Sequence, residues 1–330
     1  MSNFTGKVTR REFGKGAIAF GLATALGKPA LAQTYPSQDV HFICAFPAGS
    51  GADVIVRWYA EKVRPIMERN IIVENKVGAI GNLATEYTAR SKPDGHTIFV
   101  HGASSVGANM SLFKNPAIDA SKAIQIAATI NRQPTMMVVD ASKPWKTVAE
   151  VTAYAKEKGA KATYGISNPV GKVMGAIYKE HNKLEAVEVT YRTAADSLND
   201  MASGALDYGM FDNIFAASQE RAGRVRILAV STPTRLQANP NTPTMAEQGT
   251  PISLTGWFSA MVPTGTPRPV IDQINKVFNQ VTSTDDAKKF LNGIASDPWM
   301  LTPDEAQAAL LKEIKDWQEY VRIAKIEPQG

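Results

Sequence analysis

The stretch VHFICAFPAGSGAD at residues 40–53 is an apolar run that passes through a glycine-rich turn into a helical pattern. A strand, a tight turn and a helix form the repeating unit of α/β proteins. The first turn of a helix has unpaired backbone N–H groups and a partial positive charge, so residues 46–51 predict a turn that faces an anion. The turn lacks the Gly-Lys-Ser/Thr ending of a phosphate loop, and alone it also fits an ordinary strand-to-helix connection.

Short apolar or β-branched segments alternate with helical patterns along the rest of the chain. Helical stripes are expected over 53–67, 148–158 and 270–281, and Thr302 with Glu305 forms a capping-box pattern that opens a last helix. This alternation predicts an α/β fold. The expected strands are 40–46, 71–74, 97–101, 135–139, 163–166, 187–191, 208–211, 226–230 and 254–262.

The first 32 residues have the pattern of an export signal. Arg10 and Arg11 stand in the setting Thr-Arg-Arg-Glu-Phe-Gly-Lys, ahead of an apolar run at 17–26 and a small-x-small site at 30–32. A membrane anchor is the weaker interpretation, because spanning a bilayer takes about 20 apolar residues. The sequence predicts a cleaved twin-arginine signal at 1–32 and a periplasmic mature protein.

The charge of the chain depends on that segment. Residues 1–32 hold five of the 36 Lys and Arg residues and one of the 31 Asp and Glu residues, so residues 33–330 are nearly neutral. Nucleic-acid binding is therefore not expected. Because residues 33–330 exceed the size at which one core keeps growing, two lobes are expected.

Cysteine and histidine give no sign of a disulfide, a metal site or a cofactor. Cys44 is the single cysteine and lies in an apolar run, where a buried strand residue is expected. The four histidines show no paired ligand spacing. We predict no metal site and no cofactor.

Nine motifs follow one another along residues 33–330. They are 46–49 with Asp53 and Arg57, 73–82, 93–97, 153–156, 190–192, 210–213, 226–230, 243–249 and 263–267. With these motifs in this order, the chain resembles the tricarboxylate-binding receptor (Bug) family, the periplasmic solute receptors of tripartite tricarboxylate transporters. The resemblance covers almost all of residues 33–330.

The resemblance implies a two-lobe periplasmic binding protein of the type II, Venus-flytrap class. Each lobe would be a twisted mixed sheet flanked by helices, with lobe 1 formed by 33–132 and 231–330 and lobe 2 by 133–230. Such a receptor binds a small di-, tri- or aromatic carboxylate in the interlobe cleft, closes by a hinge motion and delivers it to the membrane subunits of the transporter. A monomer is expected.

The same resemblance implies a set of ligand-binding residues, with backbone amides as the main donors. Three of them have a second interpretation, because Asp53 also fits a helix cap, Asp212 a loop-ordering role and Arg192 a solvent-facing position. From lobe 1 the set comprises Phe46, Pro47, Ala48, Gly49, Ser50, Gly51, Asp53, Ala103, Ser104 and Ser105. From lobe 2 it comprises Ser167, Asn168, Arg192, Thr193, Ala194, Ala195 and Asp212.

Departures from the family pattern bear on the ligand. Ser50 replaces the second glycine of the first loop, Asn168-Pro169-Val170 replaces a Gly-x-Gly turn, and Thr193 replaces a glycine. These side chains should change the shape of the ligand pocket and add a side-chain hydrogen-bond donor. The hypothesis of an aromatic carboxylate, such as terephthalate, comes from four aromatic residues that we expect near the cleft: Phe46, Tyr164, Tyr191 and Trp257.

Two other function classes were considered. A receptor whose closed form docks on a membrane sensor kinase would use the same cleft. A periplasmic hydrolase would use Ser104 or Ser105 with His101, but a nucleophile needs a base within hydrogen-bond reach and usually an orienting acid, and the chain has no Gly-x-Ser-x-Gly elbow. We therefore predict a receptor and not an enzyme.

Overall fold

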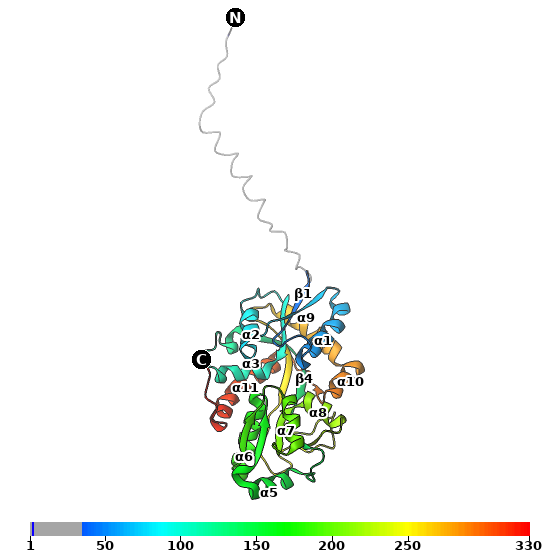
Figure 1. The fold of residues 1–330 in the computed structure, drawn as a ribbon. Coiled ribbons are helices and arrows are strands. Elements are labelled where there is room, and N and C mark those ends of the chain that lie inside the picture. Colours follow the sequence, from blue (N-terminus) through cyan, green and yellow to red (C-terminus); the bar gives the residue numbers. More distant parts are fainter. Residues whose placement is uncertain (1, 3–34) are drawn as a thin grey trace.

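The computed structural model describes residue 2 and residues 35–330. The predicted signal segment, apart from residue 2, lies outside the described residues. Two lobes are stacked end to end (Figure 1). Within the described part of the chain, no helix is long and apolar enough to cross a bilayer.

The first lobe is built on a mixed six-stranded sheet. Its strand order is β11-β4-β10-β3-β1-β2, with β1 parallel to both β2 and β3, and β10 antiparallel to both β3 and β4. The strands are β1 (Val40–Cys44), β2 (Ile71–Asn75), β3 (Thr97–Gly102), β4 (Ile124–Gln133), β10 (Gly256–Pro263) and β11 (Asp297–Pro298).

The second lobe is built on a mixed five-stranded sheet of order β7-β6-β8-β5-β9. Here β6 is parallel to β7 and β8, whereas β5 is antiparallel to β8 and β9. The strands are β5 (Thr135–Asp140), β6 (Thr163–Ile166), β7 (Val187–Thr190), β8 (Tyr208–Asp212) and β9 (Val225–Val230).

Helices cover both faces of each sheet (Figure 1). In the first lobe α1 and α9 pack on one face through Tyr59 and Phe278, and α3 and α11 on the other through Val106 and Leu310. The helices are α1 (Gly51–Met67), α2 (Asn82–Ala89), α3 (Ala103–Leu112), α4 (Ala120–Ala123), α5 (Val148–Lys158), α6 (Pro169–Asn182), α7 (Leu198–Ser203), α8 (Asn213–Arg221), α9 (Arg268–Thr282), α10 (Asp285–Gly293) and α11 (Pro303–Ile323). Short 3-10 turns occupy η1 (Ala79–Gly81), η2 (Gly159–Lys161) and η3 (Ala194–Ser197).

Every strand expected from the sequence is present, with ends shifted by up to two residues. Two strands were not expected: β4, which lies between β10 and β11, and the two-residue β11. The sequence of β4, IQIAATINRQ, contains alanines and polar residues that are poor strand formers. Asn131 is fully buried, and its Oδ1 accepts the backbone N–H of Phe258 at 2.9 Å beside a register shift between β10 and β4. The Asn131 side chain therefore supplies an acceptor for a backbone N–H of β10 at a point where the pairing between β4 and β10 is irregular.

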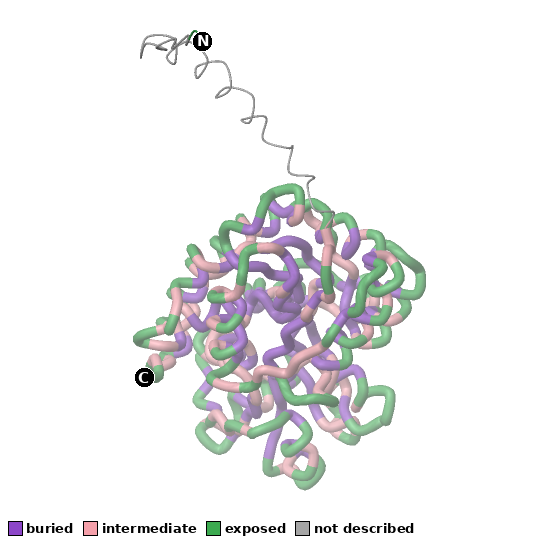
Figure 2. Tube along the Cα trace, turned by 90° about the horizontal axis from the view of Figure 1, so that it is seen from above, coloured by how far each residue is buried: buried purple, intermediate pink, exposed green. Residues whose placement is uncertain are grey.

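The chain passes between the sheets at two places. It leaves the first sheet at Gln133 and enters the second at Thr135, and it returns through the segment between β9 and β10. Helix α11 follows the first sheet in sequence, yet its Trp317 packs in a core with Tyr178 and Val173 of the second lobe. The sheets and their inner helix faces are buried, and exposed residues form the outer shell (Figure 2). Cys44 is buried in β1, as predicted.

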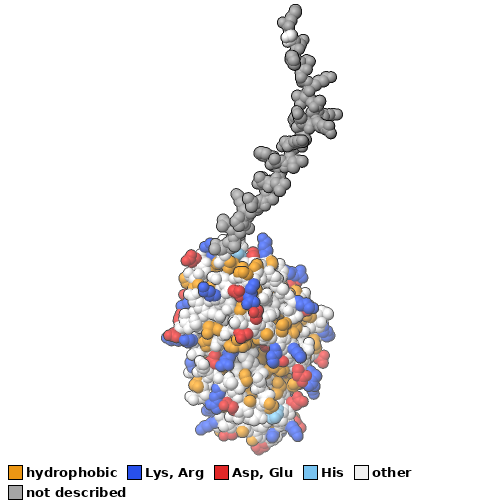
Figure 3. Space-filling model, turned by 180° about the vertical axis from the view of Figure 1, so that it is seen from behind, with side chains coloured by type: hydrophobic (Ala, Val, Ile, Leu, Met, Phe, Trp, Pro, Cys, Tyr) orange, Lys and Arg blue, Asp and Glu red, His pale blue; other side chains and the backbone are white. Residues whose placement is uncertain are grey.

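The surface has no region of a single charge sign on the face shown from behind. Lys and Arg side chains alternate there with Asp and Glu side chains and small apolar patches (Figure 3). This distribution accords with the near-neutral charge of residues 33–330 and offers no basic stripe of the kind that nucleic-acid phosphates bind.

The capping box predicted at the start of the last helix is confirmed. Thr302 Oγ1 accepts the N–H of Glu305, and Glu305 Oε2 accepts the N–H of Thr302 at 2.9 Å.

We expect Thr302→Ala to lower the free energy of unfolding by about 1 kcal/mol, because the first turn of α11 loses its side-chain acceptor. Urea unfolding followed by circular dichroism measures this loss. Thr302→Ser retains the hydroxyl and serves as the control; an equal loss in both variants would contradict the capping explanation.

Candidate functional site

A cavity of about 600 Å³ lies between the two sheets. Its walls are built where parallel strands end and helices begin: β1 leads to α1, β3 to α3, β6 to α6 and β8 to α8. In open α/β sheets this carboxyl edge of the strands is where ligands bind. Gln133, Pro134 and Thr135 from one crossing and Gly256 near the other line the cavity on the hinge side.

The four helices differ in whether a side chain accepts a hydrogen bond from the backbone N–H groups of their first turns. Three of them are capped by their own side chains: Ser50 accepts from the N–H of Asp53, Asn168 from Gly171 and Asp212 from Phe215. Helix α3 begins after Gly102 and has no side-chain cap. Its first-turn amides, beside the hydroxyls of Ser104 and Ser105, are thus unpaired donors at the cavity wall.

The structure brings together most of the predicted residues at the cavity, but not all. Pro47, Ala48 and Gly49 lie at the exposed tip of the first loop, Ala103 is buried, and Arg192 is exposed away from the lining. The predicted residues that line the cavity are Phe46, Ser50, Gly51, Ser104, Ser105, Ser167, Asn168, Thr193, Ala194, Ala195 and Asp212.

Asp53 does not line the cavity but organises the loop that does. It is buried, and its carboxylate accepts hydrogen bonds at 2.8 Å from the Gly49 N–H, Arg57 Nε and Asn75 Nδ2. Burial raises the pKa of this carboxyl, but the hydrogen bonds from Arg57, Asn75 and Gly49 outweigh it and leave the pKa below its ordinary value. Gly49 has φ +81°, a left-handed conformation that favours glycine.

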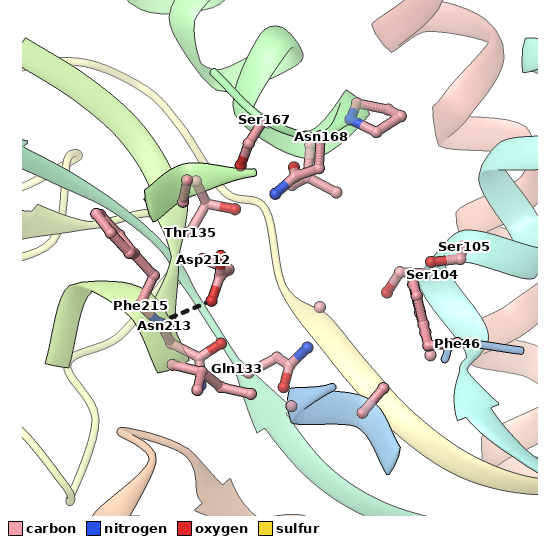
Figure 4. Close-up of a pocket in the computed structure, with 18 of the residues that line it drawn as sticks. Phe46, Ser104, Ser105, Gln133, Thr135, Ser167, Asn168, Asp212, Asn213 and Phe215 are labelled. Carbon is pink, nitrogen blue, oxygen red and sulfur yellow. Dashed lines mark hydrogen bonds between the residues drawn. The ribbon is translucent and has the colours of Figure 1, made fainter. Parts of the chain in front are cut away.

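Facing side chains come from both lobes. Ser167, Asn168 and Asp212 lie opposite Phe46, Ser104 and Ser105 across the cavity (Figure 4). Asn168 caps α6 through its Oδ1. Its Nδ2 is the side-chain hydrogen-bond donor that the replacement of the usual Gly-x-Gly turn led us to expect at the cavity. The lobes also touch: a Cβ on Gly51 would lie 2.8 Å from Ile214 Cδ1 of α8.

The cavity lining includes no Lys or Arg among the described residues. Its one acidic residue is Asp212, whose pKa is raised by burial against the opposing hydrogen bonds of the α8 amides. His101 also lines the cavity, and complete burial lowers its pKa to about 3, which keeps the imidazole neutral. An anion here would therefore be held by backbone amides and neutral polar groups rather than by an ion pair.

The arrangement does not form a nucleophile and base. Both ring nitrogens of His101 are buried without a hydrogen-bond partner in the described part of the chain, and Ser104 Oγ accepts the N–H of Trp257 at 3.3 Å. A serine nucleophile needs its base within hydrogen-bond reach.

Aromatic and apolar side chains form much of the wall. Of the four aromatic residues expected near the cleft, Phe46 and Trp257 line it, whereas Tyr164 and Tyr191 lie elsewhere and donate to Glu188 and Asp200. The sequence analysis missed further lining residues, because each reaches the cavity through tertiary packing that leaves no local pattern. Among them are Gln133, Thr135, Phe215, Phe258 and Trp317, whereas Asn213, expected at the cleft beside Asp212, does line it.

Comparisons with known proteins agree on one family. The model of the "Tripartite tricarboxylate transporter family receptor" matches residues 55–328. The protein BugT of Bordetella pertussis is 24% identical over 311 residues, which cover 92% of this chain and 95% of BugT. The resemblance that the nine motifs indicated is confirmed.

Solved structures agree on the fold. A structure titled R. palustris Rpa4515 with adipate superposes with a TM-score of 0.78 at 25% identity, covering 89% of this chain and 99% of that one. The periplasmic binding protein BugD superposes with a TM-score of 0.75 at 25% identity, covering 89% and 100%. The predicted two-lobe periplasmic binding fold is thereby confirmed.

We expect Asp53→Asn to lower the free energy of unfolding by about 2 kcal/mol at pH 7, since the carboxylate is the common acceptor for three donors. The folded-state pKa is lowered, so this contribution is present at neutral pH and is lost on acidification; the difference from the wild type should shrink below about pH 4. Urea unfolding at pH 7 and pH 3.5 measures both effects.

Asp272→Asn is the matched control, because Asp272 also pairs with an arginine four residues away, Arg268, but is half-exposed. It should change stability by less than about 0.5 kcal/mol. An equal and pH-independent loss in both variants would contradict the anchoring role of Asp53.

Proposed function

Because this chain belongs to the tripartite tricarboxylate transporter receptor family, we propose that it binds a small carboxylate in the cleft between its lobes and delivers it to the membrane subunits of such a transporter. The family consists of periplasmic solute receptors rather than enzymes. Export by the twin-arginine route, with cleavage before Gln33, is part of the proposal and rests on the sequence alone.

The observation that carries the proposal is the uncapped N-terminus of α3 at a cavity without lysine or arginine in its described lining. Unpaired amides and the helix dipole favour an anion at this end. We place one ligand carboxylate against the amides of Ser104 and Ser105, within reach of Ser50 and Gly51. From the second lobe, Ser167, Asn168, Thr193 and the backbone at Ala194 and Ala195 would contact the rest of the ligand.

The wall composition bears on the ligand's carbon skeleton. Phe46, Phe215, Trp257 and Phe258 offer apolar surface around a space of about 600 Å³. Such a lining suits a ligand with a sizeable apolar part between or beside its carboxylates. The similar structure of R. palustris Rpa4515 with adipate supports a longer aliphatic dicarboxylate as the ligand. The aromatic side chains of the wall support the alternative of an aromatic carboxylate such as terephthalate.

Ligand binding would be coupled to a rotation of the lobes. We propose that 33–132 with 231–330 and 133–230 move as the two bodies, since the strands of each sheet fall within these ranges apart from Gln133, the last residue of β4, which lies in the crossing. The crossings at 133–135 and 231–255 would supply the hinge. Closure brings the second-lobe donors to a ligand already held by the first lobe.

We expect adipate or an aromatic dicarboxylate to raise the melting temperature of the purified protein, because a ligand that binds only the folded state stabilises it by about 2.7 kcal/mol at a hundredfold excess over Kd. A thermal-shift screen with adipate, succinate, citrate, benzoate, phthalate and terephthalate tests this, followed by calorimetry on each hit. If none of these carboxylates changes the melting temperature, the proposed ligand class is wrong.

We expect Gly51→Val to weaken binding of the best carboxylate at least about tenfold, because added side-chain atoms would push against Ile214 and hold the lobes apart. The melting temperature without ligand should stay close to that of the wild type. Gly293→Ala, where an added Cβ meets nothing within 4 Å, is the control. Unchanged affinity in Gly51→Val would contradict closure at this contact.

A further inference from the structure

A second, smaller cavity of about 200 Å³ lies directly behind one wall of the ligand cavity. Ser104, Trp257 and Trp317 line both spaces, so the partition between them is one side chain thick. The second cavity also borders residues 253–256, the end of the segment that returns the chain to the first lobe. The partition therefore joins the ligand site to a proposed hinge segment.

Of the two carboxylic acids that line the second cavity, Glu313 and Asp316, only Glu313 has a hydrogen bond to a residue of the partition in the described part of the chain. Glu313 of α11 accepts a hydrogen bond from the indole Nε1 of Trp257 at 2.5 Å. Its side chain also packs on α3, because a Cβ on Gly107 would lie 3.5 Å from Glu313 Cγ. Glu313 thus contacts both the strand and the helix that form the wall where we place the ligand carboxylate.

The local surroundings of Glu313 disfavour its charge. Burial raises its pKa to about 7, and the neighbouring donors Trp257, Ser104 and Trp317 only partly oppose this effect. The other charged or titratable residues around the second cavity are Lys312, Asp316 and Tyr320, all on α11, and Lys312 pairs with Asp316. The described lining residues from β10, α3 and α6 carry no charge.

We propose that Glu313 is a positioning residue of the ligand site, which holds Trp257 and Ser104 in the cavity wall and takes up a proton when a carboxylate ligand binds. The second half of the proposal rests on the proposed function. Two negative charges on opposite sides of a partition formed by shared lining residues repel each other, so an anionic ligand favours the protonated form.

The direction in which ligand affinity changes with pH follows from the linkage between ligand binding and proton binding. If the bound ligand makes Glu313 harder to ionise, the complex holds more protons than the free protein near pH 7. Affinity must then fall as the pH rises through this range. A ligand-induced shift of half to one pKa unit from about 7 corresponds to about a 2.5-fold to fivefold loss of affinity between pH 6 and pH 8.

The test that needs no ligand follows the indole N–H of Trp257 by NMR, with ¹⁵N-labelled tryptophan in the purified protein and Trp257→Phe to identify the signal. We expect the signal to titrate with a midpoint near pH 7 in the wild type. The titration should be absent in Glu313→Gln, which keeps an acceptor oxygen for the indole. Glu319→Gln, on an exposed turn of the same helix, should titrate like the wild type.

The test with ligand uses calorimetry at pH 6 and pH 8 in buffers of different ionisation enthalpy, with adipate, succinate, citrate, benzoate and terephthalate as probes. For each carboxylate that binds, we expect proton uptake near pH 7 and weaker binding at pH 8. Glu313→Gln should bind within about twofold of the wild type at pH 6 and lose both effects. Glu313→Ala, which removes the acceptor, should bind more weakly at both pH values.

The outcomes separate this inference from the proposed function. If no carboxylate binds, the proposed function fails, and the Trp257 titration alone decides whether Glu313 carries its proton at neutral pH. If carboxylates bind but Glu313→Gln keeps the wild-type pH dependence, the inference is wrong and the function stands. A Trp257 signal that does not titrate between pH 5.5 and pH 8.5 overturns the inference in either case.

Discussion

The constraint on which this structure depends is that an anion entering the cleft loses its water and must receive other donors. The described cavity lining supplies no lysine or arginine, so the donors must come from helix N-termini and neutral side chains. Backbone amides are fixed by the fold and cost no side-chain entropy to orient, and they avoid the desolvation of a second charge. Such a site suits a receptor that must both bind its ligand and release it.

The two-sheet architecture follows from the need to aim several helix N-termini at one point. Within a parallel sheet the helices after neighbouring strands start at the same edge, but one sheet provides only one side of a cleft. Here β1 and β3 face β6 and β8 across the cavity, and the antiparallel β4 and β10 lie at the ends of the crossings that join the sheets. The mixed character of both sheets is thus a consequence of joining the lobes twice.

The features that could be predicted from the sequence are those that local patterns encode. The turn after β1, the last helix with its capping box and nine strands all follow from residue periodicity, caps and turns. Strand β4 could not be predicted, because buried Asn131 and the alanines beside it are favourable only against an irregular β10. Gln133, Phe215 and Trp317 were missed at the site for a similar reason: tertiary packing alone brings them to the cavity.

The division of roles in the site explains why the ligand is harder to infer than the family. The amide donors of α1 and α3 depend on the backbone, so many sequences can preserve them. In the proposed function, selectivity would rest on cavity-lining side chains that differ from the family pattern, such as Ser50, Asn168 and Thr193, and on lining residues that no local motif marks, such as Phe258. Glu313 lies behind these lining residues and contacts the wall through Trp257. In our proposal, its loss or gain of a proton changes the electrostatic repulsion that a bound anion meets, although Glu313 does not contact the ligand. In the proposed function, affinity for a carboxylate would therefore come from the fold and the choice among carboxylates from a few side chains, and the proposed proton on Glu313 would make that affinity depend on pH.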